Sequence, residues 1–226
     1  MLKELAFSGA LLVAFTGAHA QSSQNFGVTG QVTPGACIVT LASGGVVNVG
    51  SVSQGTAKLY PIGGVNANIV YGFPVRSVPI NIACVMATKV AVSFVDNKSA
   101  QRIAFNVDDA ARYGVADGAA GVAAIGFYSV QFINTTIDNV AVGQFLDAAA
   151  GSVTFSTTGP TAYPTSFATP GRKNAFAKAV GATVPDAFTT LAGTLEVQTF
   201  VSKSYIDAAT TVVTPIGSGT LTLVYV

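Results

Sequence analysis

The sequence predicts an all-β protein, an antiparallel β-sandwich. Apolar and polar residues alternate with a period of two through many short runs, which is typical of strands with one buried face. Turn-forming residues, rich in glycine, proline, asparagine and aspartate, separate these runs. A helical pattern is confined to one short run, Ala175 to Val180. Many short strands joined by such turns favour two packed antiparallel sheets.

The expected strands follow one another from residue 26 to the end of the sequence. They lie at Phe26–Thr33, Val46–Val49, Val78–Cys84, Val90–Phe94, Ile125–Ile133, Ile137–Val142, Leu195–Ile206 and Thr220–Val226. Turns are expected at Pro34-Gly35, Gly44-Gly45, Asp96-Asn97, Asp117-Gly118 and Gly217-Ser218-Gly219. Residues 143–192, rich in alanine, threonine, glycine, serine and proline, are interpreted as long sandwich loops with short edge strands rather than as a second domain.

Composition excludes several classes of function. The 226 residues include 11 Lys+Arg and 10 Asp+Glu, so that 9% are charged, against about 25% in an ordinary soluble domain. Such a chain has no basic patch for a phosphate backbone, and we expect no nucleic acid among its partners. Half of the residues are apolar, so burial can offset the entropy of ordering and disorder is not expected. The length suits one domain.

Residues 1–20 are predicted to be a secretory signal peptide. Lys3 gives a charged start, and the apolar stretch from Leu5 to Phe15 is shorter than the roughly 20 residues that span a bilayer. Ala18-His19-Ala20 is typical of a cleavage site. We therefore expect export, cleavage after Ala20 and loss of the only histidine.

Without a histidine, most catalytic arrangements lose their central group. Ser-His-Asp and Cys-His mechanisms need an imidazole, and zinc sites usually need histidine or several cysteines. Paired carboxylates remain available in principle, but Glu196 is the sole glutamate after residue 20 and Asp108-Asp109 the only adjacent acidic pair. Neighbours on a strand point to opposite faces, so this pair is interpreted as a solvated loop. We expect no catalytic residues, no metal and no cofactor.

Cys37 and Cys84 are the only cysteines. Because disulfides form and persist on an export pathway, we predict a bridge between them. A loop of this length is stabilised by about 4 kcal/mol in the chain-entropy model. Two free thiols or a redox pair are the alternatives, and nothing resembling C-x-x-C supports them.

Three features occur together along the chain: an alternating strand soon after residue 20, a cysteine a few residues on, and a last strand with a penultimate tyrosine. In this combination the chain resembles a chaperone–usher pilus subunit. Four shorter stretches resemble, more narrowly, a pilin-like family of unassigned detailed role from Gram-negative fimbrial operons; they are Thr33–Cys37, Ile80–Cys84, Thr88–Asn97 and Gly126–Tyr128.

The resemblance implies an immunoglobulin-like sandwich that lacks its final strand and is completed by a strand from another protein. A periplasmic pilus chaperone would lend this strand first, and at the outer-membrane usher the N-terminal extension of a neighbouring subunit would replace it. Residues 21–33 would be the donor extension, overlapping the first strand, and residues 34–226 the pilin-like domain. The expected location is the fimbrium at the cell surface, reached through the periplasm.

Residues 24–33 fit a donor strand on physical grounds as well. Phe26, Val28 and Val32 lie on one face as apolar plugs, and Gly30 leaves a gap where a facing surface can come close. Burying three such plugs contributes on the order of 5 to 9 kcal/mol before hydrogen bonds and entropy. The alternative is that this segment is the first strand of a complete sandwich.

The last strand would border the groove of the incomplete sandwich. Leu221, Leu223 and Tyr225 share one face, and Val226 ends the chain on the other. The resemblance implies that the chaperone reads this strand and holds its terminal carboxylate. An ordinary buried terminal strand is the alternative, and the two interpretations are compatible.

The sequence therefore predicts a structural fimbrial subunit that assembles by donor-strand exchange and supports adhesion to a host or other surface receptor. The alternative is a self-contained or tip-located carbohydrate-binding module. Seven tyrosines and fourteen phenylalanines offer stacking surfaces for it, although tryptophan is missing. We do not expect an enzyme.

Overall fold

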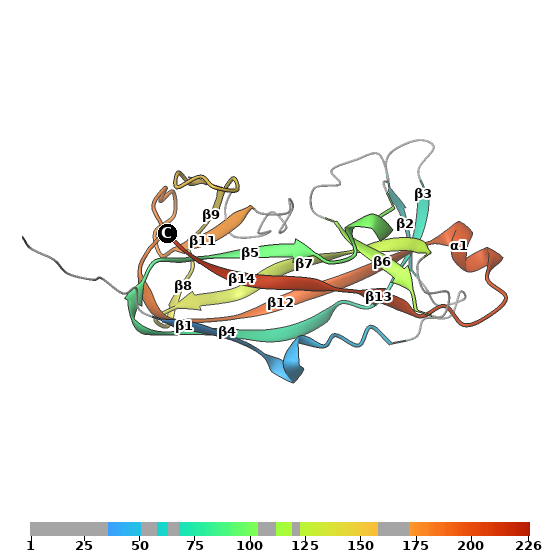
Figure 1. Cartoon of the computed structure of the whole chain (residues 1–226), viewed down its shortest axis with the longest axis horizontal. Helices are drawn as coiled ribbons and strands as arrows, with labels where there is room; N and C mark the ends of the chain where they lie inside the picture. The colour runs from blue at the N-terminus through green and yellow to red at the C-terminus, as the bar shows by residue number, and fades with distance from the viewer. Residues whose placement is uncertain (1–35, 51–57, 63–67, 104–111, 119–122, 158–171) are drawn as a thin grey trace, which may run out of the picture. The chain divides into compact units, whose positions relative to one another are not determined.

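The computed structural model describes residues 36–50, 58–62, 68–103, 112–118, 123–157 and 172–226 (Figure 1). The chain divides into two units, Met1–Thr33 and Pro34–Val226, and every described residue belongs to the second. This unit is built of antiparallel sheets in a sandwich-like arrangement, which confirms the predicted all-β class.

Strands make up most of the described elements. In chain order these are β1 (Cys37–Leu41), the 3₁₀ turn η1 (Ala42–Gly45), β2 (Lys58–Ile62), β3 (Asn68–Gly72), β4 (Arg76–Thr88), β5 (Val90–Asp96), η2 (Ser99–Gln101), β6 (Tyr113–Asp117), β7 (Ala124–Ile137), β8 (Val140–Ala141), β9 (Gln144–Ala148), β10 (Ser156–Thr157), β11 (Lys173–Ala177), β12 (Phe188–Ser202), α1 (Lys203–Ala208), β13 (Pro215–Gly217) and β14 (Gly219–Tyr225).

Within the described residues the strands form two sheets. The first has nine strands and runs β1-β4-β12-β7-β6-β13, with β3 paired to β12, β2 to β3 and β8 to β7. The second has five strands in the order β10-β9-β11-β5-β14. In Figure 1, β14 runs beside β5, whereas β4 lies beside β12 in the other layer. The last strand is therefore at an edge of the second sheet, and β1 is at an edge of the first.

The main core lies between the two sheets, where the inward side chains of both meet. The first sheet contributes Ile82, Phe132 and Leu191, and the second contributes Val92 and Phe176; each is at most 2% exposed. Each such side chain stabilises the fold by roughly 1.5 to 3 kcal/mol. The alternating pattern of the sequence thus correctly indicated that long strands bury one face in a shared core.

The predicted disulfide is confirmed. Cys37 and Cys84 are bonded and stand directly opposite each other on β1 and β4. Their Cα atoms are 4.0 Å apart, as expected for a pair that exchanges no backbone hydrogen bonds. The adjacent pair does exchange one, because the Val85 amide donates to the Ala36 carbonyl at 3.0 Å. The bond therefore fastens an edge strand to the interior of its sheet.

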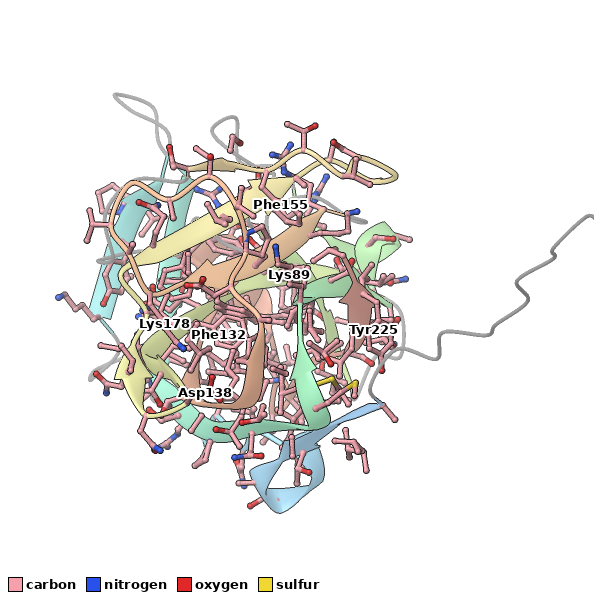
Figure 2. The ribbon with its side chains drawn as sticks, turned by 90° about the vertical axis from the view of Figure 1, so that its left-hand side faces the viewer. Lys89, Phe132, Asp138, Phe155, Lys178 and Tyr225 are labelled. Carbon is pink, nitrogen blue, oxygen red and sulfur yellow. A yellow bond between two sulfur atoms is a disulfide. The ribbon has the colours of Figure 1, made fainter. Side chains whose placement is uncertain are left out.

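The outer face of the second sheet carries a small core of its own. Ala91, Ala175 and Ala177 on this face are fully buried, and Phe155, from the segment after β9, packs against them. The Lys173 ammonium lies 5.9 Å from the centroid of the Phe155 ring. In Figure 2, Phe155 lies apart from Phe132, which belongs to the main core. Alanine at these positions lets the covering segment approach the sheet closely.

Four predictions about local structure are wrong. The strand expected at Ile137–Val142 is interrupted by a turn at Asp138-Asn139, between β7 and β8. The helical pattern at Ala175–Val180 covers the end of strand β11, where both faces are buried and the usual alternation is lost. Within residues 143–192, β9 and β11 are interior strands, and only β10 is at an edge. The strand expected to reach Ile206 ends at Ser202, and the helix α1 follows it.

Candidate functional site

An apolar groove opens between the two sheets on the side where β14 ends the second sheet. Its volume is about 480 Å³. One wall is Leu41 with residues 45–49, and the other is residues 215–219 with Leu221. The floor consists of side chains from the core-facing strands: Val78, Phe94, Tyr128, Val130, Leu195, Val197 and Thr199. The groove is thus an unfilled continuation of the main core.

The edge of β14 that faces the groove offers a row of backbone groups. The Val226 amide donates to the Lys89 carbonyl, and the Asn97 amide donates to the Ser218 carbonyl. In an antiparallel ladder every second residue pair exchanges hydrogen bonds, and the register between β14 and β5 has no shift. Even-numbered residues of β14 therefore bond to β5. The N–H and C=O groups that point away from β5 belong to Gly219, Leu221, Leu223 and Tyr225.

The opposite wall is an extended segment that pairs with no strand of the described residues. The chain turns sharply after β1, because Ser43, Gly44 and Gly45 have positive φ. It then runs extended, with Val47 and Val49 packed partly against the core. The sequence predicted a strand at Val46–Val49, and the structure gives this segment the side-chain pattern of a strand without a partner. Both walls of the groove therefore present backbone that a further strand could use.

Glycine allows the β13–β14 connection to pass over an aromatic cluster. A Cβ at Gly217 would lie 2.6 Å from the Tyr128 ring, and one at Gly219 would lie 2.1 Å from the Phe94 ring. The Tyr113 ring packs against both, with its centroid 4.8 Å from that of Phe94 and 5.1 Å from that of Tyr128. Burial raises the pKa values of Tyr113 and Tyr128 well above the ordinary range, so both phenols are neutral. The cluster closes the floor beneath β14.

The other end of the groove lies at the disulfide. The lining stops at Leu41 on one wall and Leu221 on the other. Beyond them, the Cys37 amide donates a hydrogen bond of 3.0 Å to the hydroxyl of Tyr225. Figure 2 shows Tyr225 close to the disulfide. Here a hydrogen bond joins β14 directly to β1.

The site residues predicted from sequence lie partly inside and partly outside the described residues. Leu221 and Leu223 are partly buried against the main core, as a groove edge requires. Tyr225 is 45% and Val226 36% exposed. Four residues predicted for the donor strand lie outside the described residues: Phe26, Val28, Gly30 and Val32. The donor and chaperone roles of these residues stay predictions.

Sequence reasoning missed the floor of the groove and its second wall. Val78, Val130 and Val197 come from three different strands, and no local sequence pattern indicates that their side chains border a cavity. The unpaired wall at 45–49 was visible only as a short apolar run. A possible signal was the pair Gly44-Gly45, which separates this run from β1 by a sharp turn.

The acidic groups of the described residues form no cluster of the kind that binds a metal ion. No group of three or more His, Cys, Asp or Glu residues that could hold a metal ion occurs there. The Glu196 carboxylate accepts a 2.7 Å hydrogen bond from the Gln131 amide on the neighbouring strand. Asp108-Asp109 lies outside the described residues. Among the helices described, none has the length and apolar character to cross a membrane.

Comparison with known protein families gives a match over part of the chain. Residues 26–146, more than half of the chain, match the family described as "Protein of unknown function (DUF1120)". No curated protein and no solved structure matches the chain.

Proposed function

We propose that this chain, which belongs to the DUF1120 family, is a structural subunit of a surface fimbria that assembles by accepting a β-strand from another protein. One observation carries the proposal: an apolar groove of about 480 Å³ lies between the open edge of β14 and an extended wall that has no strand partner among the described residues. A strand seated there would complete the sandwich, in keeping with the immunoglobulin-like fold that the resemblance implies.

The groove suits a strand better than a compact ligand. Gly219 and Leu221 direct backbone groups toward it two residues apart, which is the spacing of a β-ladder. Half of its lining residues are valine or leucine, so apolar side chains from alternate positions of the guest would fill it. We use "guest strand" below for a strand from another protein seated in this groove.

An open groove of this kind is an aggregation hazard until it is filled. The proposal therefore includes a periplasmic chaperone that covers the groove first, an outer-membrane usher, and a neighbouring subunit that supplies the permanent guest strand. Residues 21–33 are the proposed donor of this chain, because Phe26, Val28 and Val32 share one face. Export through the periplasm to the fimbrium follows from the same proposal.

A sugar-binding module has less support. Stacking on sugars needs exposed aromatic rings, whereas in the described residues Tyr225 is the one aromatic side chain among the exposed large hydrophobic residues. Most of the other described rings, such as Phe127 and Tyr71, are buried. We therefore keep the structural subunit as the proposal.

The test separates the two faces of the proposed donor strand. Val28→Lys puts a charge on the apolar face, and Thr29→Lys puts the same charge on the adjacent polar face. Both variants are expressed with the fimbrial operon, and polymers are counted as detergent-resistant ladders on unheated gels. We expect ladders from Thr29→Lys and none from Val28→Lys. Ladders of equal strength from both variants would overturn the assignment of residues 21–33 as donor.

A further inference from the structure

One end of the groove lies beside the disulfide and Tyr225. On its walls the lining stops at Leu41 and Leu221. The next inward residues, Val39 and Leu223, are half-buried against the main core and do not line the groove. Beyond that level the Tyr225 hydroxyl, from β14, accepts a hydrogen bond from the Cys37 amide of β1. The lining therefore offers room for the inward side chains of a guest strand as far as Leu221.

The hydrogen bond at the closed end has a fixed anchor. The Ala36/Val85 pair exchanges a hydrogen bond, so the Cys37 amide, one residue on, points away from β4. That amide meets the Tyr225 hydroxyl at 3.0 Å. The side chain of the same cysteine is bonded to Cys84. The Tyr225 hydroxyl therefore joins β14 in one sheet to β1 in the other, at a cysteine that the disulfide holds in place. The two layers pack about 10 Å apart.

We propose that Tyr225 closes the groove and sets the position at which a guest strand ends; this inference rests on the proposed function. The guest pairs with the outward backbone groups of Gly219 and Leu221 and stops before Leu223. Tyr225 acts as a positioning residue, because it limits how far the strand can advance toward the disulfide. A tyrosine that only strengthened the fold would not change where a guest strand ends.

Amide hydrogen exchange of the exported full chain, kept dilute and monomeric, tests this directly. Without a guest, the amides of Gly219, Leu221, Leu223 and Tyr225 should exchange quickly, because they point away from β5. A synthetic peptide of residues 21–33 serves as the guest. In the unchanged protein the peptide should slow exchange at Gly219 and Leu221 and leave Leu223 and Tyr225 fast.

Three variants test whether the result depends on the hydrogen bond from the Cys37 amide to the Tyr225 hydroxyl, called the closing bond below. Tyr225→Phe removes only the hydroxyl, so exchange of the Cys37 amide should rise about 2- to 12-fold, the equivalent of one net hydrogen bond. Slow exchange with the peptide should then extend to Leu223, and Tyr225→Ala should give the same extension. Tyr205→Phe is the matched control, because the Tyr205 hydroxyl donates to Asp117 at 2.9 Å outside the lining of the groove. It should behave as the unchanged protein.

The outcomes separate this inference from the proposed function. Slow exchange reaching Leu223 and Tyr225 in the unchanged protein would overturn the closing role. So would a peptide effect that ends at Leu221 in all three variants. If the peptide protects no amide of β14, the proposed donor–groove pairing fails instead. The closing bond is then judged on the Cys37 amide, and equal exchange in Tyr225→Phe and the unchanged protein overturns it.

Discussion

The second sheet ends in β14 on one side and in β10 on the other, and the two edges differ in length and in what lies beside them. β10 has two residues, Ser156 and Thr157, both exposed. Phe155, which precedes them, is buried against the alanines of the sheet's outer face. β14 has seven residues and presents Leu221 to an apolar groove.

The difference shows that only one of these edges is protected within the described chain. Natural sheets avoid edge-to-edge pairing with very short or covered edge strands, and β10 follows that pattern. β14 does not, because its edge is long and the core beside it is unfilled. On the edge of the first sheet, β1 is fastened by the disulfide and held to Tyr225. The edge of β14 is therefore the one that favours pairing with a strand from another protein.

The largest expected effect comes from placing the same charge on each edge. Leu221→Lys puts an ammonium on the groove wall, where a guest strand would have to bury it at high cost. Thr157→Lys puts it on β10, where both residues are exposed. We expect Leu221→Lys to abolish detergent-resistant ladders and Thr157→Lys to leave them unchanged. Circular dichroism should show that both variants fold, because the half-buried Leu221 position lets lysine reach water.

Ladders from Leu221→Lys at the normal level would show that the β14 edge takes no part in assembly. Loss of ladders from Thr157→Lys would show that the comparison between the edges is wrong, and that β10 also pairs between subunits.

Removing the disulfide should have the next largest effect. Cys37→Ser with Cys84→Ser releases the edge strand β1 and, in the chain-entropy model, lowers the free energy of unfolding by about 4 kcal/mol. Urea unfolding measures the loss, and the yield in the periplasm should fall sharply with it. The unchanged protein with reductant is the control for the substitutions themselves. A loss below about 1 kcal/mol would mean that β1 is held mainly by its ladder and by Tyr225.

The sequence predicted strands in which large apolar side chains alternate with smaller or polar ones, β5 among them, and it failed at β11. On β4 the alternation of Ile80 and Ile82 with polar or exposed neighbours reports one inward face. On β11 all five residues are buried, because a second small core covers the outer face of that sheet. Its alanines therefore carried no period of two, and Ala175–Val180 was mistaken for a helix. Local pattern cannot report a covering segment that comes from elsewhere in the chain.

The candidate site was predictable at its edge and not at its floor. Leu221, Leu223 and Tyr225 could be placed on one face from their spacing alone, and the structure puts both leucines against the core. The contact of Tyr225 with the Cys37 amide joins residues 188 positions apart, and only the fold brings them together. The same holds for the cavity, whose lining comes from both sheets.

Leucine truncation compares the packing beside the two edges. Leu146 on β9, next to β10, is fully buried, so Leu146→Ala should cost about 3 kcal/mol. Leu221 beside the groove is half-buried, so Leu221→Ala should cost about 1 kcal/mol in the subunit without a guest. Urea unfolding of both variants gives the two values. When a guest strand is bound, the cost of Leu221→Ala should rise, and equal costs with and without the guest would contradict the groove as its seat.

The smallest effect is expected at a turn remote from both edges. Asp138, between β7 and β8, accepts hydrogen bonds from the Thr189 hydroxyl and from the Thr189 and Thr190 amides, and its carboxylate lies 3.4 Å from the Lys178 ammonium (Figure 2). The Thr189 hydroxyl is the main cause that lowers the Asp138 pKa from 3.8 to about 2, with burial opposing it.

Because the folded pKa lies below the unfolded one, this carboxylate stabilises the fold fully above pH 3.8, and the contribution is lost as the pH falls through about 2. Asp138→Asn should lower the free energy of unfolding by about 1 kcal/mol at pH 6, and the difference should shrink toward pH 2.

Thr189→Val should raise the Asp138 pKa, as followed by NMR titration, and Thr189→Ser should not. Ladders should form in all three variants, because the turn touches neither edge. A difference in stability that persisted unchanged to pH 2 would show that Asp138 acts through its shape in the turn rather than through its charge.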